Sequence, residues 1–229
     1  MKNEIVKVEE NGFALSAGTG FDLSEEMAGL NMTFDRIKVP AGGGIAYEVP
    51  SDNPDEPDSK KEIRAVILHH HPVQTYYATE YTGGSEPPDC SSYDGKQGIN
   101  REDGVVYDCK TCDKNQFGTG NNGGKACKAK RRIFLLLEDS ALPVVLTLPT
   151  SSLNDFGKFI TRIVGKRKKS YQFISKFTLK KDQNAGGITY SKVVVALERE
   201  LTDEELRGVL PMVEQVKNMA ATLTNTGDE

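Results

Sequence analysis

From residue 62 onward, apolar residues fall into short runs that predict strands separated by turns. The first run, residues 62–81 (EIRAVILHHHPVQTYYATEY), is rich in β-branched and aromatic residues and predicts one long strand. We expect it to bend near Pro72, because proline cannot donate to a β-ladder. Four further strands are expected in two pairs, each closing around a short turn: 131–139 with 142–149, and 169–182 with 187–200.

Two segments show the periodicity of helices. Residues 151–166 follow a serine N-cap candidate, and their apolar residues recur at helical spacing on one face. A second helix is expected from Thr202, where Thr202 and Glu205 form a capping-box pattern. The apolar face of the first helix comprises Leu153, Phe156, Phe159, Ile160 and Ile163.

The N-terminal part is less regular. Residues 1–30 alternate weakly and predict a loosely packed arm. Segments 34–40 and 45–50 flank a run of three glycines and predict a hairpin with a wide turn. The Pro- and Asp-rich segment 51–61 is typical of a linker or an exposed loop.

Read from residue 62, the order is strand, insertion, strand, strand, helix, strand, strand. That order predicts a mainly β (β+α) protein built on a five-stranded oligonucleotide-binding (OB) barrel. In this fold, nucleic acid usually crosses strands two and three and is held by the loops between strands one and two and between strands four and five. The expected domains are an arm and hairpin (1–61), the barrel (62–200) with an inserted module (86–130), and a C-terminal helix (201–229).

All four cysteines of the chain fall within one stretch of glycine, asparagine and charged residues. Such a stretch buries too little apolar surface to offset the entropy of ordering it, so a structural Zn²⁺, one per chain, is expected to hold it. Free or disulfide-bonded thiols are the alternative. Because the ligand set has no histidine or carboxylate and leaves no open position, the site should be structural. The four ligands are Cys90, Cys109, Cys112 and Cys127.

The formal net charge of -4 conceals a strong polarity. From Lys125 to Lys192 there are fifteen Lys or Arg against four Asp or Glu, a net of +11, so the remainder carries -15. A basic half of this kind indicates binding to a polyanion, and a solvated basic face is the alternative. The run from Lys166 to Lys169 would also be expected at a helix C-terminus on dipole grounds alone. The candidate phosphate contacts are Lys125, Lys128, Lys130, Arg131, Arg132, Lys166, Arg167, Lys168, Lys169, Lys180 and Lys181.

Binding of single strands also requires exposed aromatic faces on which bases can stack. Phe134, Phe156 and Phe159 are expected in the core. Phe117 lies among glycines and is expected to be either a stacking platform or a plug on the zinc module. Tyr76 and Tyr77 are neighbours on a strand, so one should enter the core and the other should face outward. The stacking candidates are Tyr76, Tyr77, Tyr81, Tyr93, Phe117, Tyr171 and Tyr190.

Other chemistry is not favoured. His69, His70 and His71 are consecutive on a predicted strand, so their side chains alternate between faces and cannot all reach one metal ion. No catalytic triad, carboxylate pair or phosphate-binding loop is evident, so we expect no enzymatic activity. The chain has no apolar run of membrane-spanning length and no signal-peptide pattern at its start, so a cytoplasmic location is expected.

The motifs PPDCSS, CDKNQFGTG, GKACKAKRR and LPTSSL, followed by YSK, resemble a family encoded by bacteriophages and integrated mobile elements, sometimes called single-stranded DNA-binding proteins. The resemblance covers about residues 34–200 and implies a binding role in replication or recombination in a bacterial host. The arrangement is also similar in outline to the phage helix-destabilising protein, whose barrel carries a zinc subdomain. Members of this class commonly end in a longer acidic tail that recruits partners, whereas this chain ends in TNTGDE, so recruitment through a tail is not expected.

The sequence therefore predicts a non-enzymatic protein that coats or handles single-stranded DNA with little sequence preference, with replication or recombination proteins as further partners. Phosphates would be neutralised along the basic half while bases stack on tyrosines. The alternative is a zinc-containing protein-interaction or transcription-regulatory protein, and a third reading is a metal-dependent nuclease that uses the histidines.

Overall fold

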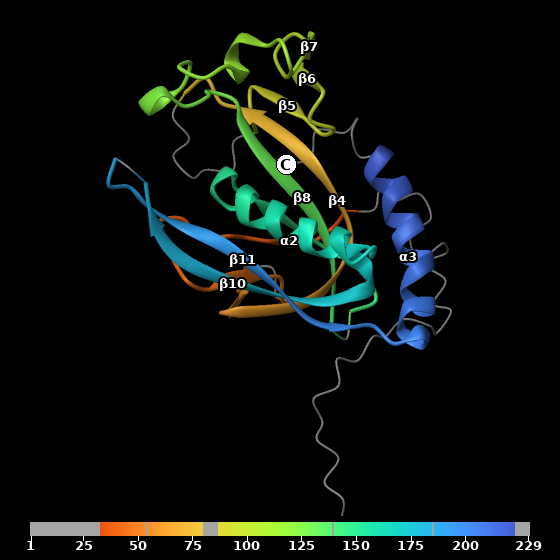
Figure 1. Cartoon of the computed structure of the whole chain (residues 1–229). Coiled ribbons are helices and arrows are strands. Elements are labelled where there is room, and N and C mark those ends of the chain that lie inside the picture. The colour runs from red at the N-terminus through yellow and green to blue at the C-terminus, as the bar shows by residue number, and fades with distance from the viewer. Residues whose placement is uncertain (1–32, 54, 80–86, 139, 185, 223–229) are drawn as a thin grey trace, which may run out of the picture.

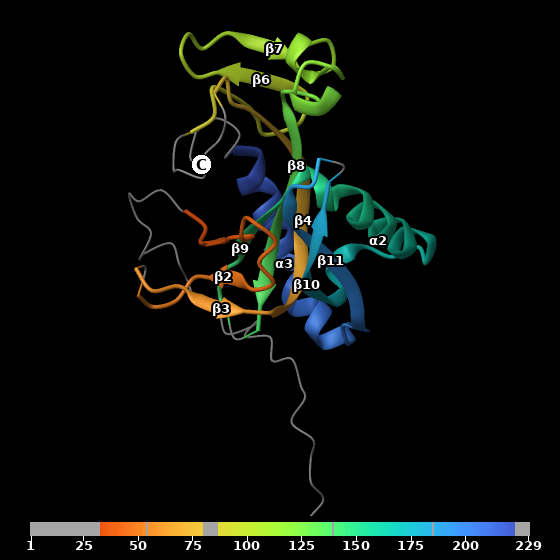
Figure 2. The ribbon, with the colours of Figure 1, turned by 90° about the vertical axis from the view of Figure 1, so that its left-hand side faces the viewer.

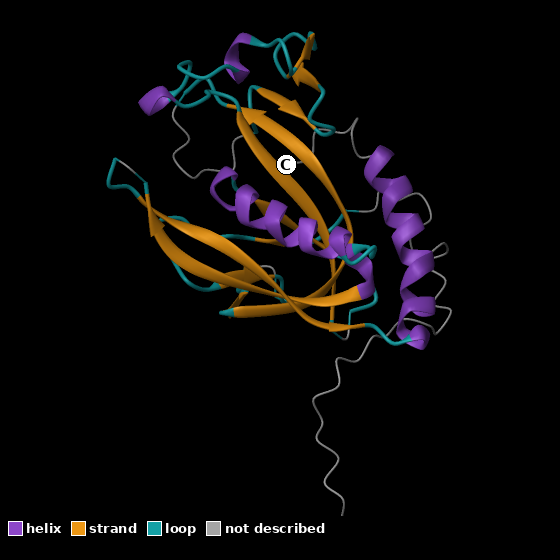
Figure 3. Ribbon diagram, viewed as in Figure 1, coloured by secondary structure: helices purple, strands orange, loops and turns teal. Residues whose placement is uncertain are grey.

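The computed structural model describes residues 33–53, 55–79, 87–138, 140–184 and 186–222, which are mainly β with two α-helices among them (Figures 1 and 3). No helix in these ranges is long and apolar enough to cross a bilayer. The strands are β1 Arg36–Ile37, β2 Tyr47–Val49, β3 Asp58–Lys60, β4 Glu62–Tyr76, β5 Cys90–Ser92, β6 Gln97–Asn100, β7 Val106–Asp108, β8 Lys128–Leu137, β9 Val144–Leu148, β10 Phe173–Gln183 and β11 Thr189–Glu200. The helices are α2 Leu153–Gly165 and α3 Asp203–Thr222.

One large mixed sheet organises the molecule. Its main path is β1-β9-β8-β4-β5-β6-β7, and β10 pairs with the start of β4 and with β11. The five expected strands are therefore β4, β8, β9, β10 and β11. A closed barrel needs five pairings among them, and four are present: β4 with β8, β8 with β9, β10 with β4 and β10 with β11. The pairing of β9 with β11 is not present in the described part of the chain. In the described part of the chain the sheet is not closed, because β1 pairs in parallel with β9 and occupies the edge that β11 would need.

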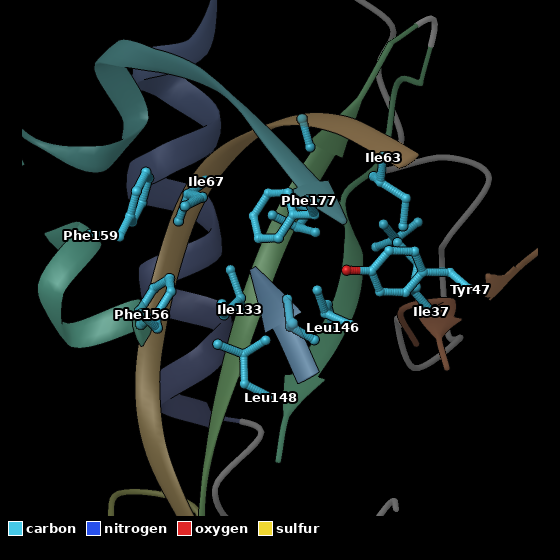
Figure 4. Close-up of a cluster of buried hydrophobic side chains, with 14 of the residues drawn as sticks. Ile37, Tyr47, Ile63, Ile67, Ile133, Leu146, Leu148, Phe156, Phe159 and Phe177 are labelled. Atoms are coloured by element: carbon cyan, nitrogen blue, oxygen red, sulfur yellow. The ribbon is translucent and has the colours of Figure 1, made fainter. Parts of the chain in front are cut away.

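The inner face of this sheet carries the larger core cluster. Phe156, Phe159 and Ile163 of α2 pack there, as the predicted apolar face requires, against residues such as Ile67 and Phe177 (Figure 4). The N-terminal segment joins the same core through Ile37, Tyr47 and Val49. The Tyr47 hydroxyl donates to the Thr178 carbonyl at 3.2 Å, which fixes this segment beside β10.

The outer face of β4, β8 and β9 is covered by α3 (Figures 1 and 2). Val209, Val213 and Val216 of the helix are buried in a second cluster that includes Phe134 of β8 and Val145 of β9. The helix start is held by the predicted capping box: the Thr202 amide donates to the Glu205 carboxylate at 2.7 Å, and the Glu205 amide donates to the Thr202 hydroxyl at 3.2 Å. A bidentate ion pair from Arg199 to Glu205 adds to this anchor.

Above the level of α2, β4 and β8 continue as a two-stranded ribbon that carries the cysteine module at its end (Figure 1). Their register runs from Ala65 opposite Leu137 to Thr75 opposite Lys128. The register of this pair is irregular between Ile67 and His69, and Pro72, near which a bend was expected, stays paired opposite Arg131. Pro72 remains in the strand because β4 is paired there with β8 alone, and an unpaired edge tolerates proline.

Several boundaries differ from the sequence prediction. The long strand ends at Tyr76, not at 81, and the expected arm 1–30 lies outside the described residues, as does Tyr81. The expected loop 51–61 contains β3, which pairs with β2. The hairpin of 34–40 with 45–50 is reduced to one antiparallel bridge between Lys38 and Glu48. Ser152 precedes α2 without a capping bond, because its buried hydroxyl accepts from the Val193 amide at 2.9 Å instead.

Candidate metal centre and nucleic-acid interface

The four cysteines come from four separate points of the module. Cys90 begins β5, Cys109 follows β7, Cys112 lies on the turn after it, and Cys127 directly precedes β8. The turn between Cys109 and Cys112 is closed by the Asp108 carbonyl, which accepts from the amides of Thr111 and Cys112. The chain therefore brings residues that are 37 positions apart to one place, at the end of the ribbon.

All four cysteines line a single pocket of about 370 Å³, and none is in a disulfide. Gly98 forms part of its wall. A Cβ at this position would lie 3.0 Å from the Cys90 sulfur and 3.5 Å from the Cys109 sulfur, so a side chain here would enter the space between the two sulfurs. Gln74 also lines the pocket, and its Oε1 accepts from the Cys127 thiol at 3.4 Å. The lack of a side chain at Gly98 thus keeps the space between the Cys90 and Cys109 sulfurs open.

The electrostatics of the pocket oppose thiolates unless a cation is present. Burial, and after it the neighbouring cysteines, raise the pKa of Cys90, Cys109 and Cys127, and together they bring that of Cys127 to about 12. A divalent cation removes both causes, since it supplies the missing counter-charge and replaces water as the partner of the sulfurs. The donor set and the shared pocket fit a four-thiolate zinc site.

As placed, no group of three or more His, Cys, Asp or Glu side chains in the described ranges is arranged to hold a metal ion.

Three lysines and two aromatic rings lie together at the end of the ribbon. The Lys125 ammonium lies 5.0 Å from the ring centre of Phe117, and the Lys130 ammonium lies 6.0 Å from that of Tyr77. Lys128 connects the two pairs, because its ammonium donates to the Lys125 carbonyl and its side chain shares one face of β8 with Lys130. We call these five residues the basic-aromatic strip: Phe117, Lys125, Lys128, Lys130 and Tyr77.

Phe117 is the most exposed large apolar residue of the strip, with 81% of its surface accessible. It lies on a loop between two short 3₁₀ turns, in which the amides of Gly118 and Gly120 donate to the Gly124 carbonyl. Gly118 has a φ of +89°, a conformation that favours glycine. Of the two alternatives for Phe117, the exposure contradicts the plug and leaves the ring available for contact with a ligand.

Tyr76 and Tyr77 do not divide between core and surface as expected. Both are half-buried. Tyr76 lines the cysteine pocket, with the Lys114 ammonium 5.6 Å from its ring centre, whereas Tyr77 belongs to the strip on the opposite face. The prediction that one of the two enters the core is wrong, because β4 ends at Tyr76 beyond the reach of either core cluster.

Two of the predicted phosphate contacts, Arg131 and Arg132, pack against other side chains of the protein. Arg131 lies on the α2 side of β8, where its guanidinium donates to His70 Nδ1 at 2.9 Å and lies 5.8 Å from the ring centre of Phe156. Arg132 is buried on the other face, with its guanidinium 5.3 Å from the ring centre of Tyr93, which is itself buried. The placement of Arg132 and Tyr93 corrects the expectation that both face solvent.

The three histidines alternate between faces, as predicted. His69 and His71 stack on each other and against Phe134, while His70 points to Phe156 on the other side. Burial lowers the pKa of all three, and burial together with the adjacent Arg131 brings that of His70 to about 4. His70 is therefore neutral near pH 7 and able to accept the hydrogen bond from Arg131.

The remaining candidates lie away from the strip. Lys168 is ion-paired with Glu200, and the ammonium groups of Lys166 and Lys168 lie about 6 Å from the ring of Phe173, at 5.9 and 5.8 Å. Tyr171 packs against the outer core cluster. The others occupy the turn after α2 or the β10–β11 hairpin: Arg167 and Lys169 are exposed in the turn, Lys180 and Lys181 are exposed on β10, and Tyr190 is half-buried beside Asp182.

Sequence reasoning missed three features of the site. Gln74 joins the cysteine pocket from β4 through the pairing of β4 with β5 and β8. Lys114 joins it from a 3₁₀ turn, where its carbonyl accepts from the Cys127 amide. The cover of α3 over β8 and β9 was also missed, although the apolar positions 209, 213, 216 and 220 carry its signal.

Searches of protein families, of curated proteins and of solved structures found no match to this chain.

Proposed function

We propose that this protein binds single-stranded DNA, without cleaving it, through the basic-aromatic strip at the end of the β4–β8 ribbon. The observation that carries the proposal is the combination of cations and rings in this strip, in which three lysines lie between two aromatic rings: Phe117 with Lys125, then Lys128, then Lys130 with Tyr77. Single-strand binding needs both kinds of group, since cations neutralise phosphates and ring faces stack on bases.

The contacts within the strip suggest how binding would proceed. A lysine ammonium that lies over a ring is held by a weak interaction, on the order of 0.5–1 kcal/mol at an exposed site. A phosphate competes well for such a cation, and the flexible lysine stem allows the ammonium to swing to it. The Lys125 ammonium, which also donates to Asn115 Oδ1 at 3.2 Å, would then leave the ring face of Phe117 to a base.

The strand order supports a relationship to OB folds, since β4, β8, β9, β10 and β11 follow that connectivity apart from the missing closure between β9 and β11. The usual ligand face of such a fold is occupied here by α3, which buries Phe134 and Val145 on the outer side of β8 and β9. Nucleic acid would therefore bind further along β8, beyond the end of α3, where the loop between the first two barrel strands forms the cysteine module. The loop between β4 and β8 would thus keep its usual role in binding, whereas the part of β8 and β9 under α3 would not contact nucleic acid.

We further propose that Cys90, Cys109, Cys112 and Cys127 hold one structural Zn²⁺. The metal would fix the backbone on both sides of Phe117 and Lys125, because Cys112 and Cys127 flank that loop in the sequence. Less entropy is then lost when the strip clamps a strand. In this account zinc supplies order, and the contacts with nucleic acid come from the side chains of the strip.

A fluorescence anisotropy titration tests the proposal. The full chain is titrated into labelled oligo-dT and into a duplex of equal length, each at 50 and 200 mM salt. We expect tighter binding to the single strand, with an affinity that falls steeply with salt. Equal affinity for both nucleic acids would point to non-specific attraction by the basic half, and no binding at either salt concentration would refute the function.

A further inference from the structure

One short side chain links the cysteine pocket to the basic-aromatic strip. Asn115 lines the pocket from the 3₁₀ turn that follows Cys112. Its Nδ2 donates to the Cys109 carbonyl, and its Oδ1 accepts from the Lys125 ammonium at 3.2 Å. A single half-buried amide therefore contacts both the candidate metal centre and a cation of the strip.

The chemistry of the two partners fixes the orientation of this amide. A carbonyl oxygen can only accept a hydrogen bond, and a lysine ammonium can only donate one. The amide must therefore turn its NH₂ group to Cys109 and its oxygen to Lys125. Asparagine carries a donor and an acceptor on separate atoms of one rigid group, whereas an ionised aspartate at this position would have no donor for the Cys109 carbonyl.

The backbone around Asn115 is tied to two further cysteines. The Asn115 amide donates to the Cys112 carbonyl at 3.0 Å, and the Lys114 carbonyl accepts from the Cys127 amide at 2.8 Å. Two adjacent residues thus hold the backbone of three of the four cysteines. Any loosening of the turn at Cys109 and Cys112 would reach Asn115 directly.

The backbone of Lys125 is held by its own loop, whereas its ammonium is held by Asn115. A Cβ at Gly120 would lie 2.6 Å from the Lys125 carbonyl group, so the glycine loop closes tightly on this residue. The ammonium lies 5.0 Å from the ring centre of Phe117 and donates to Asn115. That bond uses one of the three N–H donors of a lysine, so the others remain for phosphate oxygens.

We infer that Asn115 is a positioning residue through which the cysteine centre regulates single-strand binding. Ligation of the four cysteines fixes the carbonyls of Cys109 and Cys112, and these carbonyls hold Asn115 in place. Asn115 in turn keeps the Lys125 ammonium within the strip when it leaves the ring of Phe117 for a phosphate. Without this anchor, Lys125 has the freedom of a long side chain, which is lost again on binding. This regulation of the strip rests on the proposed function.

Coupling of this kind is reciprocal. If zinc at the cysteines tightens the binding of a single strand by some factor, a bound strand must tighten the binding of zinc by the same factor. Coupled sites commonly show factors of about 5–150. We expect a factor of about ten, towards the lower end, because one lysine side chain is positioned here.

Gln116 provides a matched control in the same turn. Its Nε2 donates to the carbonyls of Lys110 and Cys112, each at 3.3 Å, so its described hydrogen bonds reach the cysteine turn and not Lys125. A variant at Gln116 therefore disturbs the turn as a variant at Asn115 does, and it leaves the connection to the strip in place.

The test uses the full chain in its zinc-free and zinc-loaded forms. Fluorescence anisotropy gives the dissociation constant for labelled oligo-dT in each form, and competition with a chelator gives the zinc affinity with and without unlabelled oligo-dT. Both ratios should be about tenfold in the parent. Asn115→Ala should reduce each ratio to less than about twofold, whereas Gln116→Ala should keep each within about twofold of the parent value.

A double-mutant cycle shows whether Asn115 acts through Lys125. Lys125→Met keeps the stem without the charge and should also remove the coupling. Addition of Asn115→Ala to this variant should then change the affinity of the zinc-loaded form for oligo-dT by less than about twofold. If Asn115→Ala fails to take up zinc, the Lys125→Met variant decides alone, since a retained tenfold ratio contradicts the role of Lys125.

The outcomes separate this inference from the proposed function. A parent that binds oligo-dT equally with and without zinc overturns the inference and leaves single-strand binding intact. The same holds for an Asn115→Ala variant that keeps the parent ratio, and for an additive effect in the double variant. A parent that binds no oligo-dT in either form overturns both.

Discussion

Replacement of Phe117 by alanine separates binding from stability more cleanly than any other change in the strip. The side chain is 81% accessible, so about one fifth of the ~1.5–3 kcal/mol that full burial of phenylalanine provides is at stake, or ~0.3–0.6 kcal/mol. Loss of the contact with Lys125 adds on the order of 0.5–1 kcal/mol. The melting temperature should therefore fall by no more than about 4–6 °C in a chain of this size.

Binding to single-stranded DNA should respond far more strongly. Removal of a stacking ring costs ~1–3 kcal/mol, which corresponds to a rise of the dissociation constant by about 5- to 160-fold. Phe117→Tyr keeps the ring and should bind like the parent, whereas Phe117→Leu keeps the apolar surface without a flat ring and should behave like the alanine variant. Val164→Ala, at a residue of α2 that is 62% exposed, is the matched control.

The assay is fluorescence anisotropy with labelled oligo-dT, with melting temperature and zinc content measured on the same preparations. An alanine variant that binds within twofold of the parent would refute the role of Phe117 as a platform. Equal loss in the leucine and tyrosine variants would show that the loop, and not the ring, is responsible.

Three further predictions concern the metal, the salt dependence and the pH dependence. Metal analysis of protein purified without chelator should give one zinc per chain, and Cys112→Ser should lower this stoichiometry; a value near zero with four titratable thiols in the native parent contradicts the site. Joint replacement of Lys128 and Lys130 by alanine should reduce the slope of log affinity against log salt concentration for single-strand binding by about 1.4, at ~0.7 per phosphate contact. Lys60→Ala, at an exposed residue, is the control. An unchanged slope in the folded variant contradicts phosphate contact. The His70 pKa is lowered to about 4 mainly by burial, so its neutral form stabilises the fold fully above about pH 6.5, and up to about 3 kcal/mol is lost as the pH falls from there towards 4. Chemical denaturation at several pH values should show this slope in the parent and a flatter one in His70→Gln.

Much of the fold follows from local patterns. The spacing of Phe156, Phe159 and Ile163 predicted the buried face of α2, and the Thr202–Glu205 capping box predicted the start of α3, because both signals lie within one or two turns of helix. The closure of the barrel was not predictable in this way. It depends on whether β1 or β11 pairs with β9, a choice between strands more than 100 residues apart.

The candidate site shows the same division. The clustering of the cysteines was readable from their spacing, since one pocket receives all four. The surroundings of Arg131 and Arg132 could not be predicted. They depend on the residue of β8 at which the helices stop covering the strand, and the sequence near these arginines does not indicate that residue. The prediction for Tyr76 and Tyr77 was wrong for a related reason. Alternation along a strand assigns the two side chains to opposite faces, but it does not show how far along the strand the core extends.

Photo-cross-linking tests the central claim most directly. A single-stranded oligonucleotide with 5-bromodeoxyuridine is irradiated in complex with the full chain, and the cross-linked residues are identified by mass spectrometry. The account predicts adducts at Phe117 and Tyr77, with none at Tyr171 or Tyr190, and loss of the Phe117 adduct when unlabelled oligo-dT competes. Adducts confined to the β10–β11 hairpin, or the absence of any adduct under conditions of saturating DNA, would contradict it.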